Sequence, residues 1–193
     1  MIPLNPDWRK GIIGASNFAE WAASRPEASF YDLWEEIIDP EWLVRLAKIG
    51  GATQQQVTLA VCAVARLCLH LVPEWENRPR IAIETAEKWC RGEATQRKVR
   101  KARDESEDTY RIYSLLPCPA QHQILNAIDA TTYAATNATN VSSHTYATAA
   151  VYSALRAGIE SQVLCATIRE HLVFERPPRP KGLTIWQRLA VED

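Results

Sequence analysis

The sequence is poor in glycine, with only seven in 193 residues, and this scarcity disfavours a turn-rich all-β fold. It also lacks an excess of charge, since 22 Lys and Arg residues stand against 23 Asp and Glu, a formal net charge of −1. A chain without net positive charge lacks the bulk attraction that drives nucleic-acid binding, so a nucleic-acid partner is disfavoured. Apolar residues still make up 47% of the chain, which excludes a disordered protein and indicates one folded domain.

Paired cysteines and ordered metal ligands are also missing. The five cysteines are odd in number and form no CxxC pair, and Cys62 and Cys68 lie within an apolar run. We interpret them as free, buried thiols, which favours a reducing cytoplasm. Residues 1–10 show no signal-peptide pattern, in keeping with a cytoplasmic location. The four histidines show no zinc-site spacing and no glycine-rich phosphate loop is present, so neither a metal nor a cofactor is predicted.

No apolar run is long enough to cross a membrane. The stretch 57–72 is interrupted by Arg66 and His70, and the uncharged stretch 130–155 contains many Thr, Ser and Asn residues. Neither provides the roughly 20 predominantly apolar residues that a spanning helix needs, so no membrane contact is expected.

What the sequence does contain is a succession of helix signals. Asp39 is placed to cap a helix that starts with Pro40, and Gly50-Gly51 to end it. Between Thr53 and Leu71 the apolar residues fall all round the helix, which is typical of a central helix in a bundle. The predicted helices cover 29–38, 40–49, 53–71, 78–91, 95–116, 120–135, 141–157 and 159–174, with a turn over 137–140. The sequence thus predicts an all-α, single-domain bundle of about seven to eight helices around a central apolar helix.

Composition divides the chain into three parts. Residues 1–50 form an acidic, Trp-rich helical extension with 8 acids against 5 bases, and residues 51–174 form the bundle core. Residues 175–193 form a Pro-rich connector and a short terminal helix over 185–190, from which Trp186 is expected to dock on the body.

The acidic extension contains the best candidate for a recognition surface. Trp is enriched at binding hot spots, and carboxylates would attract a basic partner such as a nuclease toxin. The candidate residues are Trp34, Glu35, Glu36, Asp39, Glu41 and Trp42. The alternative is that both Trp side chains cap the bundle core while the acids face solvent.

The segment 78–103 has the opposite charge, with 9 bases and 3 acids. It is either a solvated face, or a docking surface for an acidic partner, or a nucleic-acid contact. At its start, Arg78 and Arg80 flank a Pro at a helix N-terminus, where cations are mildly unfavourable. They therefore form salt bridges to a neighbouring helix or contact an anion or a partner, and both are kept as candidate partner-binding residues.

Residues 73–95, PEWENRPRIAIETAEKWCRGEAT, carry a motif of Arg78-Pro79-Arg80, Glu84, Trp89, Gly92 and Glu93. With the Ala-rich stretch that follows, this region resembles the all-helical immunity protein family of bacterial polymorphic-toxin systems, over about residues 53–172. The resemblance implies neutralisation of a toxin by binding, and it assigns no catalytic residue.

Three functional hypotheses follow. The first is a non-enzymatic, cytoplasmic helical binding protein that masks a protein partner. The second is a structural or adaptor module of a bacterial or phage system, which forms a homo-oligomer through its Ala-rich face. The third is an enzyme built in the bundle, using His122, Asp129 or His144.

Overall fold

The computed structural model describes residues 1–12, 17–117, 120–140 and 144–176. In these residues the fold is all-α, with nine α-helices and, apart from one isolated bridge between Ile2 and Phe174, no β-structure. The helices are α1 (Asn17–Ala23), α2 (Phe30–Glu36), α3 (Pro40–Ile49), α4 (Gln54–Arg66), α5 (Arg78–Cys90), α6 (Gln96–Ser114), α7 (Gln121–Thr139), α8 (His144–Arg156) and α9 (Ser161–His171), with 3-10 turns η1 (Trp8–Gly11) and η2 (Leu69–Leu71). The all-α prediction is confirmed. The count exceeds seven to eight by α1, a seven-residue helix that the sequence pattern did not predict.

Helix starts are fixed by the capping residues that the sequence provides. Asp39 Oδ1 accepts hydrogen bonds from the backbone N–H groups of Glu41 and Trp42 at 2.8 and 3.3 Å, and Pro40 opens α3 as predicted. Thr53 caps α4 in a reciprocal capping box with Gln56. These bonds satisfy N–H groups that a helix start would otherwise leave without partners.

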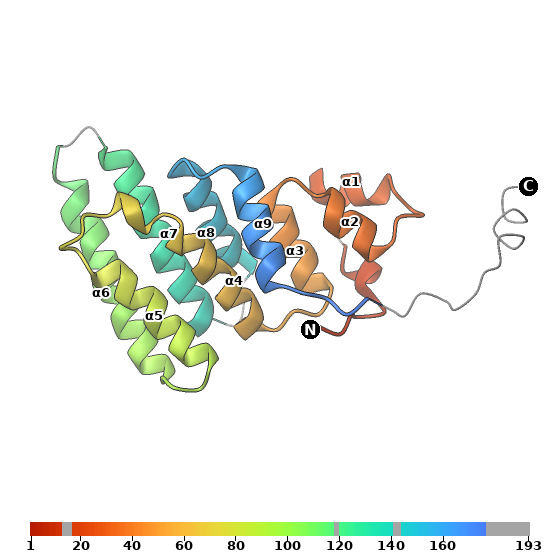
Figure 1. The fold of residues 1–193 in the computed structure, drawn as a ribbon, viewed down its shortest axis with the longest axis horizontal. Coiled ribbons are helices and arrows are strands. Elements are labelled where there is room, and N and C mark those ends of the chain that lie inside the picture. The colour runs from red at the N-terminus through yellow and green to blue at the C-terminus, as the bar shows by residue number, and fades with distance from the viewer. Residues whose placement is uncertain (13–16, 118–119, 141–143, 177–193) are drawn as a thin grey trace, which may run out of the picture.

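The core is built around α4 and α7. Helix α4 packs against α3, α5, α7, α8 and α9, which confirms the predicted central helix, and α7 packs against α4, α5, α6 and α8. Figure 1 shows the consequence: α5 and α6 form one end of an elongated array, and α1 and α2 form the other. Helix α4 ends at Arg66 rather than near residue 71, because the chain tightens into η2.

The turn predicted over 137–140 is wrong, since α7 continues to Thr139. Asn137 is fully buried, and its Nδ2 donates to Thr58 Oγ1 on α4 at 2.8 Å. Its backbone carbonyl accepts from Gln54 Nε2 at 2.7 Å. Partners from α4 allow an asparagine to lie inside a helix that its local preferences would end.

The N-terminal residues pack onto the bundle of their own chain. Ile2 and the segment after α9 exchange backbone hydrogen bonds of 2.7 and 2.8 Å, through Val173 and Glu175. Arg169 on α9 reaches across to donate to the carbonyls of Trp34, Glu35 and Ile37 at the end of α2. The carbonyls that α2 leaves without helical partners are thereby satisfied by a long-range contact.

No helix of the described residues is long and apolar enough to cross a membrane. Cys62, Cys68 and Cys165 are buried free thiols and Cys90 is half-buried, whereas Cys118 lies outside the described residues. Burial raises the pKa of Cys68 and of Cys90 to about 12, so neither is a reactive thiolate near neutral pH. The terminal helix expected over 185–190, with Trp186, also lies outside the described residues.

Candidate functional site

The two tryptophans of the predicted acidic surface are packed into the protein. Trp34 is only 6% exposed, and its ring stacks on Phe30 at a centroid distance of 5.9 Å and meets Phe174 at 5.1 Å. Trp42 is half-buried and packs against Phe18 and Trp21. Both rings therefore stabilise the junction of the N-terminal helices with the bundle.

Three of the four carboxylates of that surface have partners within the chain. Glu35 receives a hydrogen bond from Arg176 at 2.9 Å, and Glu36 pairs with Arg25 at 3.0 Å. Asp39 is the cap of α3 described above. Glu41 is half-buried, and burial together with the charge of Asp39 raises its pKa. The structure brings these residues together. The carboxylates of Glu35, Glu36 and Asp39 are satisfied within the protein, and among the described residues the carboxylate of Glu41 has no hydrogen bond or ion pair.

Arg78 and Arg80 differ from each other. Arg78 Nε donates to Glu76 Oε1 at 2.8 Å, and this pairing lowers the pKa of Glu76. The partner of Arg78 thus lies in the preceding loop, not on a neighbouring helix. Arg80 is exposed and lines a groove of about 400 Å³ with Arg66 and His70.

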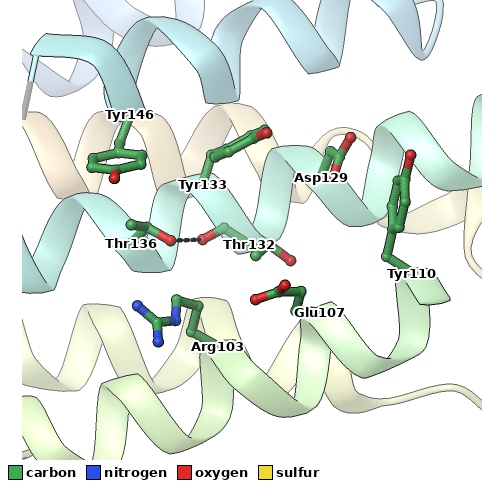
Figure 2. Close-up of a pocket in the computed structure, with 8 residues that line it drawn as sticks. All are labelled: Arg103, Glu107, Tyr110, Asp129, Thr132, Tyr133, Thr136 and Tyr146. Carbon is green, nitrogen blue, oxygen red and sulfur yellow. Dashed lines mark hydrogen bonds between the residues drawn. The ribbon is translucent and has the colours of Figure 1, made fainter.

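A cleft of larger volume than this groove, about 490 Å³, lies between α6, α7 and α8, and Figure 2 shows it. Its lining residues come from three helices and combine three tyrosines, two carboxylates, one guanidinium and two hydroxyls. They are Arg103, Glu107 and Tyr110 on α6, Asp129, Thr132, Tyr133 and Thr136 on α7, and Tyr146 on α8. We call this feature the tyrosine cleft.

Asp129 is the unusual residue of the tyrosine cleft. Its side chain is half-buried, and within the described ranges it has no hydrogen bond and no ion pair. Burial, and then the negative charge of Glu107, raise the pKa of this carboxyl to about 6. A carboxylate that gives up hydration without gaining a partner is energetically unfavourable, and functional sites are enriched in such groups.

Apart from the three tyrosine hydroxyls, the other polar side chains of the cleft already have partners. Thr132 Oγ1 lies 2.9 Å from Ser106 Oγ, and Thr136 Oγ1 donates to the carbonyl of Thr132 at 2.8 Å (Figure 2). Arg103 donates to Asp104 at 2.9 Å, and Glu107 Oε1 accepts from Arg111 at 2.8 Å. The charged group of the cleft that lacks a partner is therefore the carboxylate of Asp129.

Aromatic rings complete the site. The rings of Tyr133 and Tyr146 stack with centroids 6.4 Å apart at an interplanar angle of 27°. Burial and the charge of Asp129 raise the pKa of Tyr133, so its hydroxyl stays protonated at neutral pH. Tyrosine faces attract cations, and here they stand beside an unpaired carboxylate.

Sequence reasoning found this site only in part. It selected Asp129, but in combination with His122, whose Nε2 lies 2.9 Å from Arg156 Nη2; the side chain of His144 lies outside the described part of the structure. It missed Glu107 and the three tyrosines, because they look like ordinary helix positions until α6, α7 and α8 meet. In the described part of the chain, no three His, Cys, Asp or Glu side chains are grouped as metal ligands.

Exposed apolar side chains form a second feature, at the end of the array where α6 stops. Trp75 is 83% exposed and Leu115, the C-cap of α6, is 82% exposed. Ile112 in the last turn of α6 and Leu116 just after the helix end are about half exposed. The loop that carries Trp75 lies against α6, since the side chain of Thr109 is near enough to contribute to lowering the pKa of Glu76. We call Trp75, Ile112, Leu115 and Leu116 the apolar end patch.

Comparison of the chain with protein-family models, with curated proteins and with solved structures finds no match. The candidate sites therefore stand on their own geometry and chemistry.

Proposed function

We propose that this protein is a non-enzymatic helical binding protein that masks a basic protein partner, the role that its resemblance to toxin-immunity proteins implies. The observation that carries the proposal is the apolar end patch, above all the 83% exposure of Trp75. Single exposed apolar residues are normal, but a solvent-exposed Trp with three aliphatic side chains at the same end of the molecule is typical of an interface. Trp is also the residue most enriched among those that dominate binding energy.

Charge beside the patch supports a basic partner. Residues 104–116, which include the patch residues of α6, contain four carboxylates and one guanidinium. Several of these groups form exposed pairs within α6, such as Arg111 with Glu107 and Asp108, but the net charge of the segment is still negative. A negative rim would steer a basic partner to the patch and raise the association rate, while buried apolar contacts would set the lifetime.

The acidic residues at α2 and α3 fit this role less well, because Glu35 and Glu36 are paired with arginines and Asp39 caps α3, which leaves Glu41 as the one carboxylate of that set without a partner in the described residues. The buried free thiols support action in a reducing compartment such as the cytoplasm.

The test is an affinity purification of the tagged full chain from its native host, with mass spectrometry of the eluate and light scattering of the complex. We expect a stoichiometric basic protein that is retained at low salt. Capture should be lost in the double variant Trp75→Ser, Leu115→Ser. The matched control is Ile38→Ser, which removes another apolar side chain, 78% exposed, in the connection between α2 and α3.

Other outcomes would overturn the proposal. Loss of capture on reversal of Glu35, Glu36 and Glu41 to Lys, but not in the end-patch variant, would move the interface to the acidic N-terminal surface. A partner-free homo-oligomer would favour the structural or adaptor module.

A further inference from the structure

The tyrosine cleft has the composition of a receptor for an organic cation. Its volume of about 490 Å³ falls in the range of small-ligand sites, about 300–1,000 Å³, and is large enough for a long basic side chain and part of its backbone. Its lining lacks apolar aliphatic side chains, so an aliphatic ligand would find little to bury against. The hydroxyls of Thr132 and Thr136 are engaged within the protein, and the carboxylates of Asp129 and Glu107 would repel an anion.

What the cleft lacks is a cation for Asp129. The charged and titratable groups facing it are Glu107, Arg103 and Tyr110 from α6, Tyr133 from its own helix and Tyr146 from α8. Arg103 pairs with Asp104, and no positive charge contributes to the pKa of Asp129. The second oxygen of Glu107, Oε2, has no partner within the described ranges. Two carboxylates thus share one cleft without a cation between them.

The geometry points to the tyrosine cleft as the receptor for an arginine side chain carried by the partner, held by Asp129 and Glu107 and covered by tyrosine rings. Arginine suits it better than lysine, because a planar guanidinium both pairs with carboxylates and stacks on aromatic faces. The identity of the occupant as part of a protein rests on the proposed function, whereas the cation chemistry of the cleft does not. Glu107 belongs to the same acidic segment of α6 that leads to the apolar end patch, so one partner can contact both.

A direct titration tests the cation chemistry without the partner. The probe is Nα-acetylarginine N-methylamide, and its matched control is the citrulline analogue, which has the same shape and no charge. Binding to the full chain is followed through the resonances of ¹³C-labelled tyrosines. At pH 7.5 we expect shifts of Tyr133 and Tyr146 with the arginine probe, and none with citrulline.

Variants then locate the cation. Asp129→Asn should weaken binding of the probe at least tenfold. Glu105→Gln, which removes a carboxylate of α6 that pairs with Lys101 and does not line the cleft, should leave the affinity within twofold. Tyr146→Leu should weaken binding of the arginine probe several-fold. Lowering the pH from 7.5 to 5 should weaken binding of the arginine probe to the wild type but not to Asp129→Asn. Equal binding of the citrulline analogue, or unchanged binding in Asp129→Asn, would overturn the inference.

The partner assay separates the two proposals. If Asp129→Asn weakens both partner capture and binding of the probe, the arginine side chain that occupies the cleft belongs to the partner. If the probe binds but Asp129→Asn captures the partner normally, the cleft serves a free organic cation and the proposed function stands. If the partner is captured and the probe does not bind, only the inference about the cleft fails.

Discussion

Two regions of this protein combine carboxylates with aromatic rings, and the fold treats them in opposite ways. At α2 and α3, Glu35 and Glu36 pair with arginines, Asp39 caps a helix and Trp34 is buried against Phe30 and Phe174. In the tyrosine cleft, Asp129 has no partner in the described structure and three tyrosines line an open volume. The first region uses its charges and rings for stability, and the second leaves them available.

Composition alone therefore does not identify a recognition surface. Acidic residues interspersed with Trp look like a hot spot in the sequence, but arginines distant along the chain, Arg169 and Arg176, are used at that very place. The relevant property is whether the tertiary structure satisfies each polar group, because an unsatisfied group retains its capacity to bind.

The largest expected effect concerns the aromatic rings of the two regions. Trp34→Ala should destabilise the protein by about 3–5 kcal/mol, because it leaves a cavity in a well-packed cluster. Tyr146→Ala, which truncates a half-buried ring at the rim of the cleft, should cost about 1 kcal/mol. Urea denaturation followed by circular dichroism checks both. Similar costs for the two variants would contradict the division into a structural and an available region.

An intermediate effect is expected for the carboxylates at α2 and α3. Asp39→Ala should cost about 1 kcal/mol, since it removes the acceptor for two N–H groups at the start of α3. Glu36→Ala is the matched control, because its exposed pair with Arg25 should contribute less than about 0.5 kcal/mol. Midpoints of urea unfolding at pH 7 distinguish the two, and a larger cost for Glu36→Ala would show that the surface pair matters more than the cap.

The smallest expected change in stability concerns Asp129, and its direction with pH is well defined. The folded protein raises its pKa from 3.8 to about 6, so the folded state holds this proton more tightly than the unfolded chain. The carboxyl therefore becomes destabilising as pH rises from about 4 through 6, and above that range the cost is constant. Asp129→Asn, which resembles the protonated acid, should gain about 1 kcal/mol over wild type at pH 7.5, a value reduced by solvent screening of a partly exposed group.

The measurement is urea unfolding of wild type and Asp129→Asn at pH 7.5, 6 and 4, with Glu105→Gln, outside the cleft, as the control. The difference between wild type and Asp129→Asn should shrink toward zero at pH 4. If Asp129→Asn is less stable than wild type at pH 7.5, then Asp129 already has a stabilising partner, and its carboxylate is not free to bind a cation.

Much of the fold was predictable because helix boundaries are local. Asp39 with Pro40, and Thr53 with Gln56, fix helix starts through bonds that span only two or three residues. Prediction failed where distant residues decide. Asn137 stays helical because Thr58 and Gln54, about 80 positions away, bond to it.

The candidate site was harder to predict for the same reason. Glu107 and Tyr146 are 39 positions apart, and nothing in the sequence marks them as neighbours. Trp75 and Trp34 are both tryptophans beside acids, yet one is 83% exposed and the other is 6% exposed. Their difference depends on which helices cover each ring.

The all-α class, the central helix and most helix starts follow from local sequence features, because caps, proline, glycine and apolar periodicity act over one or two turns. Only the tertiary structure decided which charges are satisfied and which apolar residues stay in solvent. Those outcomes depend on contacts between residues far apart in the chain, such as Arg169 with the end of α2 and α6 with α7 and α8. A polar group gains a partner or keeps its binding capacity only when these elements have come together.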